Sequence, residues 1–171
     1  MDKMDILSIN NEIAIKFNIL EKDIAGCDGL GELFAKLVFD SAEAFDIPAV
    51  WISLVRIPET WPIVYALNNE PALKDRLNVI EQSAFSELCP EGHTPLLAFV
   101  DLHAFYRLMP PKLKFIIRSI AVAPFHLHGY TIGSINHGDP SPERYRPGMD
   151  TTMLEHLMAV FSLRLSELLI R

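Results

Sequence analysis

The sequence predicts an α+β domain in which an antiparallel sheet carries long N- and C-terminal helices on one face and short helices and loops on the other. Two long segments with helical periodicity, one near each end of the chain, predict the long helices. The nearly continuous apolar run 49–56 and the hairpin-like segment 119–135 predict the sheet between them. The order of the elements, with helices first, then strands separated by small helices, then a hairpin and a long helix, favours antiparallel pairing.

Size and charge indicate one acidic domain. The chain has 171 residues, half of them apolar, which is enough for one hydrophobic core. Its 15 basic and 22 acidic residues give a net charge of −7, which argues against nucleic acid and anionic membranes as partners. Residues 1–5 lack the basic and apolar regions of a signal peptide, and no apolar stretch is long enough to span a membrane, so we expect a cytoplasmic protein.

The two terminal helices are predicted from stripes of apolar residues. In the first, over about 8–25, the stripe consists of Ile13, Phe17, Leu20 and Ile24. In the last, expected to begin at a capping box of Thr152 and Glu155, it consists of Leu154, Met158, Phe161, Leu165 and Leu168. The last helix has a second apolar stripe and cannot bury both stripes on one sheet. We therefore expect one stripe to meet the first helix and its symmetry mate, so that the two sets of residues named above form a homodimer interface. Residues 1–28 are then a dimerisation helix, and residues 29–171 a single domain ending in the long helix.

The segments between these helices are predicted from composition and turn residues. A second helix follows the glycine-rich stretch 26–31 and presents a broad apolar face to the sheet before it ends near Asp46. Asp101 is expected to cap a short helix that ends near Leu108, before Pro110. Strands are expected at 49–56, 61–67, 77–80, 94–100, 116–125 and 130–135, with a short helix at 83–88.

Two stretches resemble a known family of domains. Residues 10–55, NNEIAIKFNILEKDIAGCDGLGELFAKLVFDSAEAFDIPAVWISLV, resemble the opening helices and first central strand of a GAF domain. Residues 119–157 resemble the closing part of an uncharacterised bacterial GAF-like family of unknown function. The chain keeps that pattern at Ser119, Ala121, Pro124, Gly133, Gly138, Pro142, Glu143, Arg144, Tyr145, Pro147 and Thr151. It lacks the asparagine, lysine, phenylalanine, aspartate and glutamate signature of cyclic-nucleotide-binding GAF domains.

The resemblance implies a three-layer domain of the profilin and PAS type, with a small-molecule pocket between the sheet and the small helices. The candidate ligand-binding residues there are Trp51, Phe99, His103, Phe105, Tyr106, Ser119 and Arg144. The helix 101–108 is the candidate lid of this pocket. For any single aromatic residue in the set, packing in the core is the alternative explanation.

Histidines offer a candidate metal site. His126 and His128 are two residues apart at a strand end, and with His103 or His137 they supply donors for a metal ion. The alternative, which we favour, is a solvated hairpin turn, because no carboxylate or cysteine stands at a matching spacing. Nothing in the sequence requires a cofactor.

The two cysteines offer a candidate nucleophile. Cys89 and His93 have the residue types of a thiol and its base, as a GAF-type methionine-sulfoxide reductase would need. Pro90 and Gly92 explain the same segment as a helix stop, which we favour. Cys27 lies too far away in the sequence to form a CxxC motif.

Arginines offer a candidate anion site. Arg144 and Arg146, with His137 nearby, present donors that suit a carboxylate or phosphate. The alternative, which we favour, is that Arg144 pairs with an acidic neighbour, Glu143 or Asp139, and fixes the loop before the last helix.

The sequence as a whole favours a non-enzymatic sensory or regulatory module. Such a module binds an unidentified small molecule, dimerises through its terminal helices and acts on a separate signalling protein. A small thiol- or metal-dependent enzyme and a ligand-free dimerisation scaffold are the alternatives.

Overall fold

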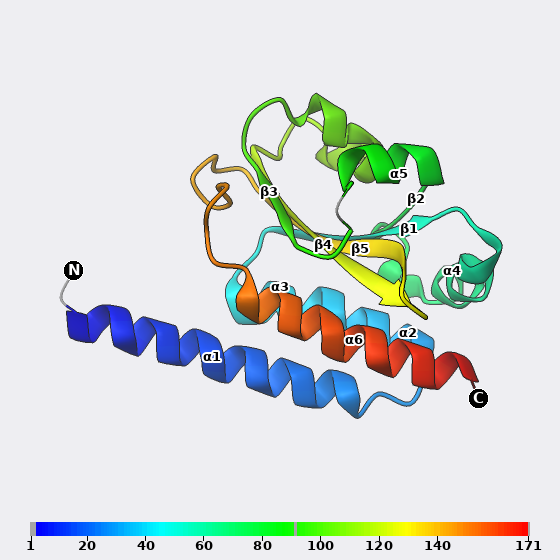
Figure 1. The fold of residues 1–171 in the computed structure, drawn as a ribbon, viewed down its shortest axis with the longest axis horizontal. Helices are drawn as coiled ribbons and strands as arrows, with labels where there is room; N and C mark the ends of the chain where they lie inside the picture. The colour runs from blue at the N-terminus through cyan, green and yellow to red at the C-terminus, as the bar shows by residue number, and fades with distance from the viewer. Residues whose placement is uncertain (1–2, 91, 171) are drawn as a thin grey trace.

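The computed structural model describes residues 3–90 and 92–170. Five strands and a series of helices follow one another along the chain (Figure 1). The α-helices are α1 (Lys3–Ala25), α2 (Leu30–Ala35), α3 (Ser41–Phe45), α4 (Trp61–Asn68), α5 (Gln82–Leu88) and α6 (Thr152–Ile170). The strands are β1 (Ala49–Val55), β2 (Leu77–Ile80), β3 (Leu96–Ala98), β4 (Ser119–Leu127) and β5 (Tyr130–Asp139). A π-helical turn, η1 (Lys36–Asp40), joins α2 to α3, and short 3-10 segments are η2 (Pro58–Thr60), η3 (Pro71–Leu73), η4 (Leu102–Leu108) and η5 (Pro111–Leu113).

The sheet is mixed rather than antiparallel. Its strand order is β2-β1-β5-β4-β3, in which β2 runs parallel to β1 and the other pairs are antiparallel. The prediction of a strand at 61–67 is wrong, because this segment is helix α4 and Pro62 sits in its first turn, where a missing N–H costs nothing. Because a helical crossover connects them, β1 and β2 pair in parallel. The prediction of an antiparallel sheet is therefore wrong at this edge.

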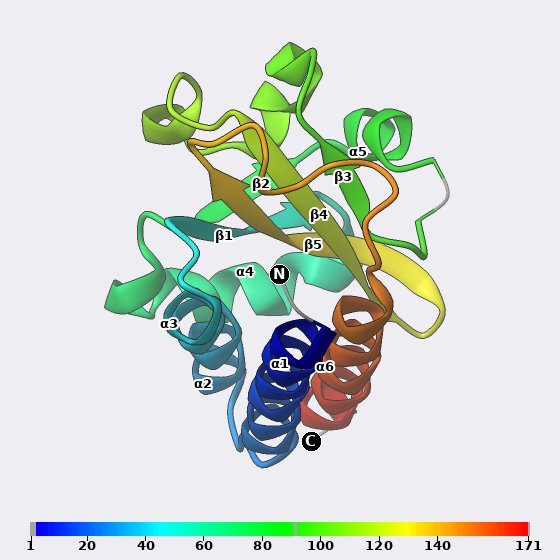
Figure 2. The same cartoon turned by 90° about the vertical axis from the view of Figure 1, so that its left-hand side faces the viewer.

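Two layers of helices cover the two faces of the sheet (Figure 2). The helix layer consists of α1, α2 with α3, α4 and α6. The small-helix layer consists of α5, η4 and η5. This arrangement agrees with the predicted α+β class and with long terminal helices on one face. Among the described residues, no helix combines the length and the apolar character needed to cross a membrane.

The core on the helix-layer side is built around three aromatic rings. Phe34, Phe125 and Phe161 pack edge to face, with ring centroids 5.1 to 5.8 Å apart. Six residues predicted for the dimer interface are buried in this same core: Leu20, Ile24, Met158, Phe161, Leu165 and Leu168. These six side chains join α1 to α6 within one chain, so the expected contact of the last helix with the first is present, and the homodimer stays a prediction (Figure 1).

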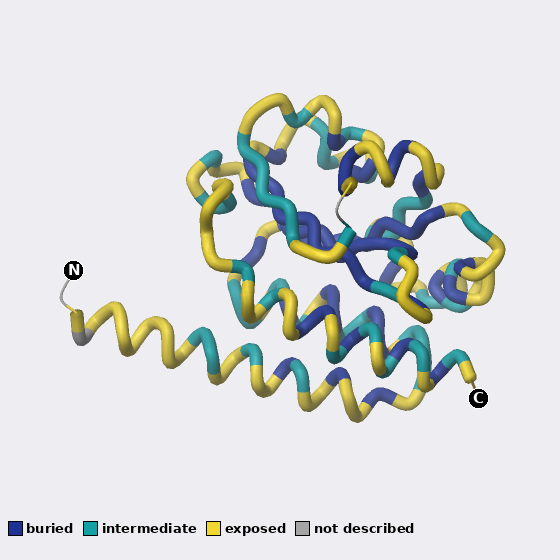
Figure 3. Tube along the Cα trace, in the orientation of Figure 1, coloured by how far each residue is buried: buried dark blue, intermediate teal, exposed yellow. Residues whose placement is uncertain are grey.

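The other residues of the predicted interface, Ile13, Phe17 and Leu154, are half-buried. The N-terminal half of α1 extends past α6 and is mostly exposed (Figure 3). The exposed apolar side chains of α1 are Ile6, Leu7, Ile9, Ile15 and Ile19.

The core on the small-helix side is tied together by buried hydrogen bonds. The Leu108 carbonyl accepts from Trp51 Nε1 at 2.6 Å and from Ser53 Oγ at 3.0 Å. Asn136 Nδ2 donates to Ser53 Oγ at 3.0 Å and its Oδ1 accepts from Ser134. All four polar side chains are fully buried, so these bonds hold η4 against the sheet.

Two predicted caps are placed differently. Asp101 has a left-handed backbone, with φ of 53°, and makes no side-chain capping bond, so the following segment is a 3-10 helix. At the start of α6, Asp150 Oδ1 accepts the Thr152 N–H at 3.0 Å, and Thr151 rather than Thr152 bonds the Glu155 carboxylate. These two bonds take the place of the predicted capping box of Thr152 and Glu155.

Candidate functional site

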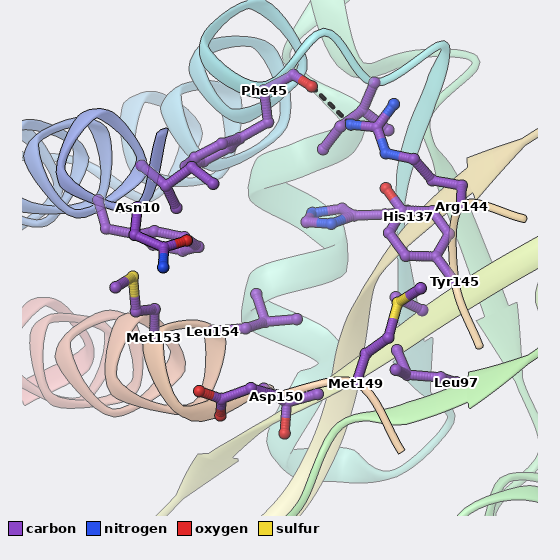
Figure 4. Close-up of a pocket in the computed structure, with 15 residues that line it drawn as sticks. Asn10, Phe45, Leu97, His137, Arg144, Tyr145, Met149, Asp150, Met153 and Leu154 are labelled. Carbon is purple, nitrogen blue, oxygen red and sulfur yellow. Dashed lines mark hydrogen bonds between the residues drawn. The ribbon is translucent and has the colours of Figure 1, made fainter. Parts of the chain in front are cut away.

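A cavity of about 350 Å³ lies between the helix layer and the sheet, near the end where α1 extends past α6 (Figure 4). Its walls come from α1, the end of α3, strands β3 to β5, the loop 140–151 and the first turn of α6. The apolar lining residues are Ile13, Phe17, Phe45, Ile47, Leu97, Ala121, Met149, Met153 and Leu154, and the polar ones are Asn10, His137, Arg144, Tyr145, Asp150 and Thr151. A mostly apolar cavity with a few polar groups is typical of small-molecule sites.

His137 projects into this cavity from β5 (Figure 4). It lies between Val50 of β1 and Ala121 of β4, and strand alternation turns all three side chains to the helix layer. The side chain is only 7% exposed, and its Nε2 has no hydrogen-bond partner among the described residues. Burial, and secondarily the charge of Arg144, lower the pKa of His137 to about 4, so the imidazole is neutral at pH 7.

Tyr145 brings a second buried polar atom to the same end of the cavity. Its ring centroid lies 6.4 Å from that of His137, and its hydroxyl also has no hydrogen-bond partner within residues 3–90 and 92–170. Burial raises the pKa of Tyr145 to about 12, so the hydroxyl keeps its proton. Burying a polar group without a hydrogen-bond partner costs roughly 1–3 kcal/mol of stability. A molecule that hydrogen-bonds to both atoms at this end of the cavity would remove that cost.

Arg144 closes the site and holds its walls together. One terminal nitrogen donates to the Phe45 carbonyl at 2.6 Å, and the other to the Asp46 carbonyl and to Asp139 Oδ2, both at 3.2 Å. Asp46 ends α3 in a left-handed conformation, so the guanidinium satisfies carbonyl groups at a helix C-terminus. The favoured structural role of Arg144, with Asp139 as its acidic partner, is confirmed.

Two more predicted ligand-binding residues anchor the loop 140–151 rather than line the cavity. Ser119 is fully buried and donates to the Ser141 carbonyl at 2.6 Å. Phe99 lies 4.4 Å from the guanidinium of Arg146, measured to the ring centroid. Both contacts fix the loop that carries Arg144 and Tyr145.

The remaining predicted ligand-binding residues lie on the opposite face of the sheet. Trp51 and Phe105 are buried in the core of the small-helix layer, where Tyr106 packs against them. His103 is exposed, and its ring lies 4.8 Å from that of Tyr106. These four residues therefore do not join the cavity, and Arg144 is the one member of the predicted set that lines it.

From the sequence, His137 is a candidate only as a metal or anion partner, and Tyr145 belongs to the family pattern without a binding role. Alternation along β5 signals that His137 faces the helix layer. Whether its Nε2 has a hydrogen-bond partner depends on the positions of α1 and of the loop 140–151. The alternation pattern of β5 does not predict these positions.

The candidate metal histidines are engaged elsewhere. His126 Nε2 lies 2.6 Å from the Gly92 carbonyl, and its ring stacks on His93 at 5.3 Å between centroids. His128 sits in the β4–β5 turn with φ of 52°. Within residues 3–90 and 92–170, no group of three or more histidine, cysteine, aspartate or glutamate side chains is arranged to hold a metal ion.

The candidate thiols are buried. Burial raises the pKa of Cys89 to about 11, so this thiol stays protonated at neutral pH. Burial, with Glu32 as a smaller cause, also raises the pKa of Cys27, whose Sγ donates to the Asp23 carbonyl. Neither side chain is held as the thiolate that nucleophilic chemistry uses.

In comparisons with known proteins, no family model matches the chain, and no curated protein matches it.

Proposed function

We propose that this chain is a non-enzymatic regulatory module of the GAF-like type that binds a small molecule in the cavity at His137. The observation that carries the proposal is the pair of buried polar atoms, His137 Nε2 and Tyr145 OH, that lack partners at one end of an apolar cavity. A ligand with a hydrogen-bonding group relieves the cost of both atoms, whereas apolar packing relieves neither.

The cavity is suited to regulation because both terminal helices contribute to its walls. Ile13 and Phe17 come from α1, and Met153 and Leu154 come from the first turn of α6. A ligand between these helices changes how α1 packs on α6, and it favours whichever arrangement it fits best. The position of α1 is then the signal that a separate protein reads.

A second copy of the chain is the proposed partner of the exposed part of α1. The apolar stripe of Ile13, Phe17 and Leu20 continues toward the N-terminus to Ile6, which is 45% exposed because α1 extends past α6 at this point (Figure 3). A self-complementary stripe suits a two-fold homodimer. Sedimentation of the wild type against Ile6→Lys tests this, since the variant remains monomeric at concentrations where the wild type is a dimer. Equal sedimentation of the two proteins argues against the interface.

Ligand binding is tested by a screen of small molecules that follows the melting temperature. The variant Leu154→Trp fills the cavity from the first turn of α6, and Leu163→Trp is its matched control, because Leu163 is 63% exposed on the same helix and does not line the cavity. We expect compounds that stabilise the wild type and Leu163→Trp but leave Leu154→Trp unchanged. Compounds that stabilise all three proteins equally, or none at all, contradict the proposal.

A further inference from the structure

We propose that the ligand is an uncharged, hydroxyl-bearing molecule about the size of two fused rings, with its hydroxyl held between His137 and Tyr145. This inference rests on the proposed function and specifies the chemistry of the same site. It follows from the size of the cavity, the charges at its polar end and the hydrogen-bonding capacity of the two orphaned atoms.

The volume of the cavity sets the size of the ligand. A dry engineered cavity of roughly 150 Å³ takes up one benzene ring. The cavity here has a volume of about 350 Å³, which accommodates two fused rings with a small substituent. The rings Phe17 and Phe45, whose centroids lie 4.5 Å apart, and the side chain of Leu154 supply apolar walls for such a body.

The charges at the polar end favour an uncharged ligand. Arg144 already donates to Asp139 and to two backbone carbonyls, so its charge is balanced and three of its five N–H groups are used. His137 is neutral at pH 7. A carboxylate brought to this end loses its hydration without gaining an unpaired cation, which costs more than burying a neutral hydroxyl.

The two unpartnered atoms, His137 Nε2 and Tyr145 OH, can both hydrogen-bond to one hydroxyl group of a ligand. The neutral His137 ring accepts a hydrogen bond at Nε2 when Nδ1 carries the ring hydrogen. The Tyr145 hydroxyl donates one. A ligand hydroxyl donates to the first and accepts from the second, so one polar atom of the ligand satisfies both side chains.

The ligand reaches these atoms by displacing flexible side chains. His137 Nε2 and Tyr145 OH are both closed off from solvent, so a wall of the cavity must yield when a ligand enters. Met149 and Met153 line the cavity and are 45% and 39% exposed. Methionine is unbranched and adapts to new neighbours, so these two lining side chains can move aside at little cost.

Three probes of one shape test the inference: 2-naphthol, naphthalene and 2-naphthoate, titrated into the full chain at pH 7 by calorimetry. We expect 2-naphthol to bind about tenfold or more tightly than either of the others, which is the ratio that one to two net hydrogen bonds supply. The double variant His137→Leu with Tyr145→Phe keeps the apolar walls. In that variant the preference for 2-naphthol over naphthalene disappears, while naphthalene binds at least as well as before.

Failure of this inference is distinguishable from failure of the proposed function. Equal affinities for the three probes, or tighter binding of 2-naphthoate, overturn the uncharged hydroxyl while the cavity remains a binding site. A double variant that keeps the preference for 2-naphthol also overturns the proposed role of His137 and Tyr145. If no probe binds, this inference falls, and the compound screen still decides the proposed function. If all three probes bind Leu154→Trp as well as the wild type, the cavity itself is not the site and both proposals fall. Circular dichroism of each variant confirms that it is folded before titration.

Discussion

Lowering the pH is expected to destabilise the folded chain through His137. The pKa of about 4 in the folded chain, against 6.5 for a free imidazole, means that the unfolded chain binds the proton more readily between these two values. No penalty is present above about pH 6.5; it grows as the pH falls, and it is complete below about pH 4. The full difference in protonation free energy is about 3 kcal/mol, of which about 2 kcal/mol is reached by pH 5.

Urea denaturation at a series of pH values measures this effect. The free energy of unfolding of the wild type is compared with that of His137→Gln, which cannot titrate, and with His103→Gln, a control at an exposed position on the other face of the sheet. We expect the wild type and His103→Gln to lose about 2 kcal/mol more than His137→Gln between pH 7.5 and 5. If all three proteins lose the same amount, the imidazole of His137 is not held neutral by burial and the reasoning is refuted.

Three further predictions concern the packing around the site. Gly133→Ala is expected to lower the free energy of unfolding by about 1–3 kcal/mol, because the added carbon meets the facing backbone of β1. Gly29→Ala is the control, because it has open space around it and leaves the denaturation midpoint nearly unchanged. Similar midpoints for the two variants contradict the packing at Gly133. Ser119→Ala breaks a hydrogen bond that fixes the loop 140–151 and lowers the free energy of unfolding by about 1–2 kcal/mol. Ser41→Ala removes a buried hydroxyl that has no partner among the described residues, so it keeps or raises stability. The reverse order of the two melting temperatures argues against these assignments. Phe161→Ala costs about 3–5 kcal/mol at every protein concentration, because its ring belongs to the core of one chain; a loss that depends on concentration would place the ring in a dimer interface instead.

The elements with strong patterns were predictable from the sequence. The run 49–56 is apolar throughout, and β1 is buried along its full length, as a central strand requires. The stripe of Leu20 and Ile24 correctly predicted a buried helix face, but a stripe does not say whether its partner is the same chain or a second one. The structure supplies α6 of the same chain as that partner.

The direction of β2 was not predictable because it depends on the segment before it. The short apolar run 61–67 fits a strand or a helix, since periodicity cannot separate the two over so few residues. Pro62 is tolerated at the start of either element. Once the segment is helical, β2 returns parallel to β1 and the sheet becomes mixed.

The glycines of the family pattern gain a physical reason from the structure. A side chain at Gly133 would collide with the Ser53 carbonyl and the Phe125 ring, and one at Gly138 would come within 2.7 Å of Ile117 and 3.0 Å of Trp51. These contacts involve residues far away in the sequence, so a sequence pattern can mark the two positions without explaining them.

Of the candidate site, only the ion pair that fixes one of its walls was predictable from the sequence. Arg144 and its acidic partner Asp139 follow from local charge, and the bond is present. The family resemblance placed a pocket on the small-helix side, where Trp51 and Phe105 are packed in the core, and the cavity that contains His137 lies on the other face of the sheet. An orphaned atom such as His137 Nε2 is a property of the whole packing, and no local pattern encodes it.

The most direct test of the central claim is a crystal structure of the chain soaked with 2-naphthol. The account predicts electron density for the probe between α1, α6 and the sheet, with its hydroxyl within hydrogen-bond distance of both His137 Nε2 and Tyr145 OH. Density on the other face of the sheet, beside Trp51 and Phe105, or density in the cavity with the hydroxyl turned toward solvent, contradicts it.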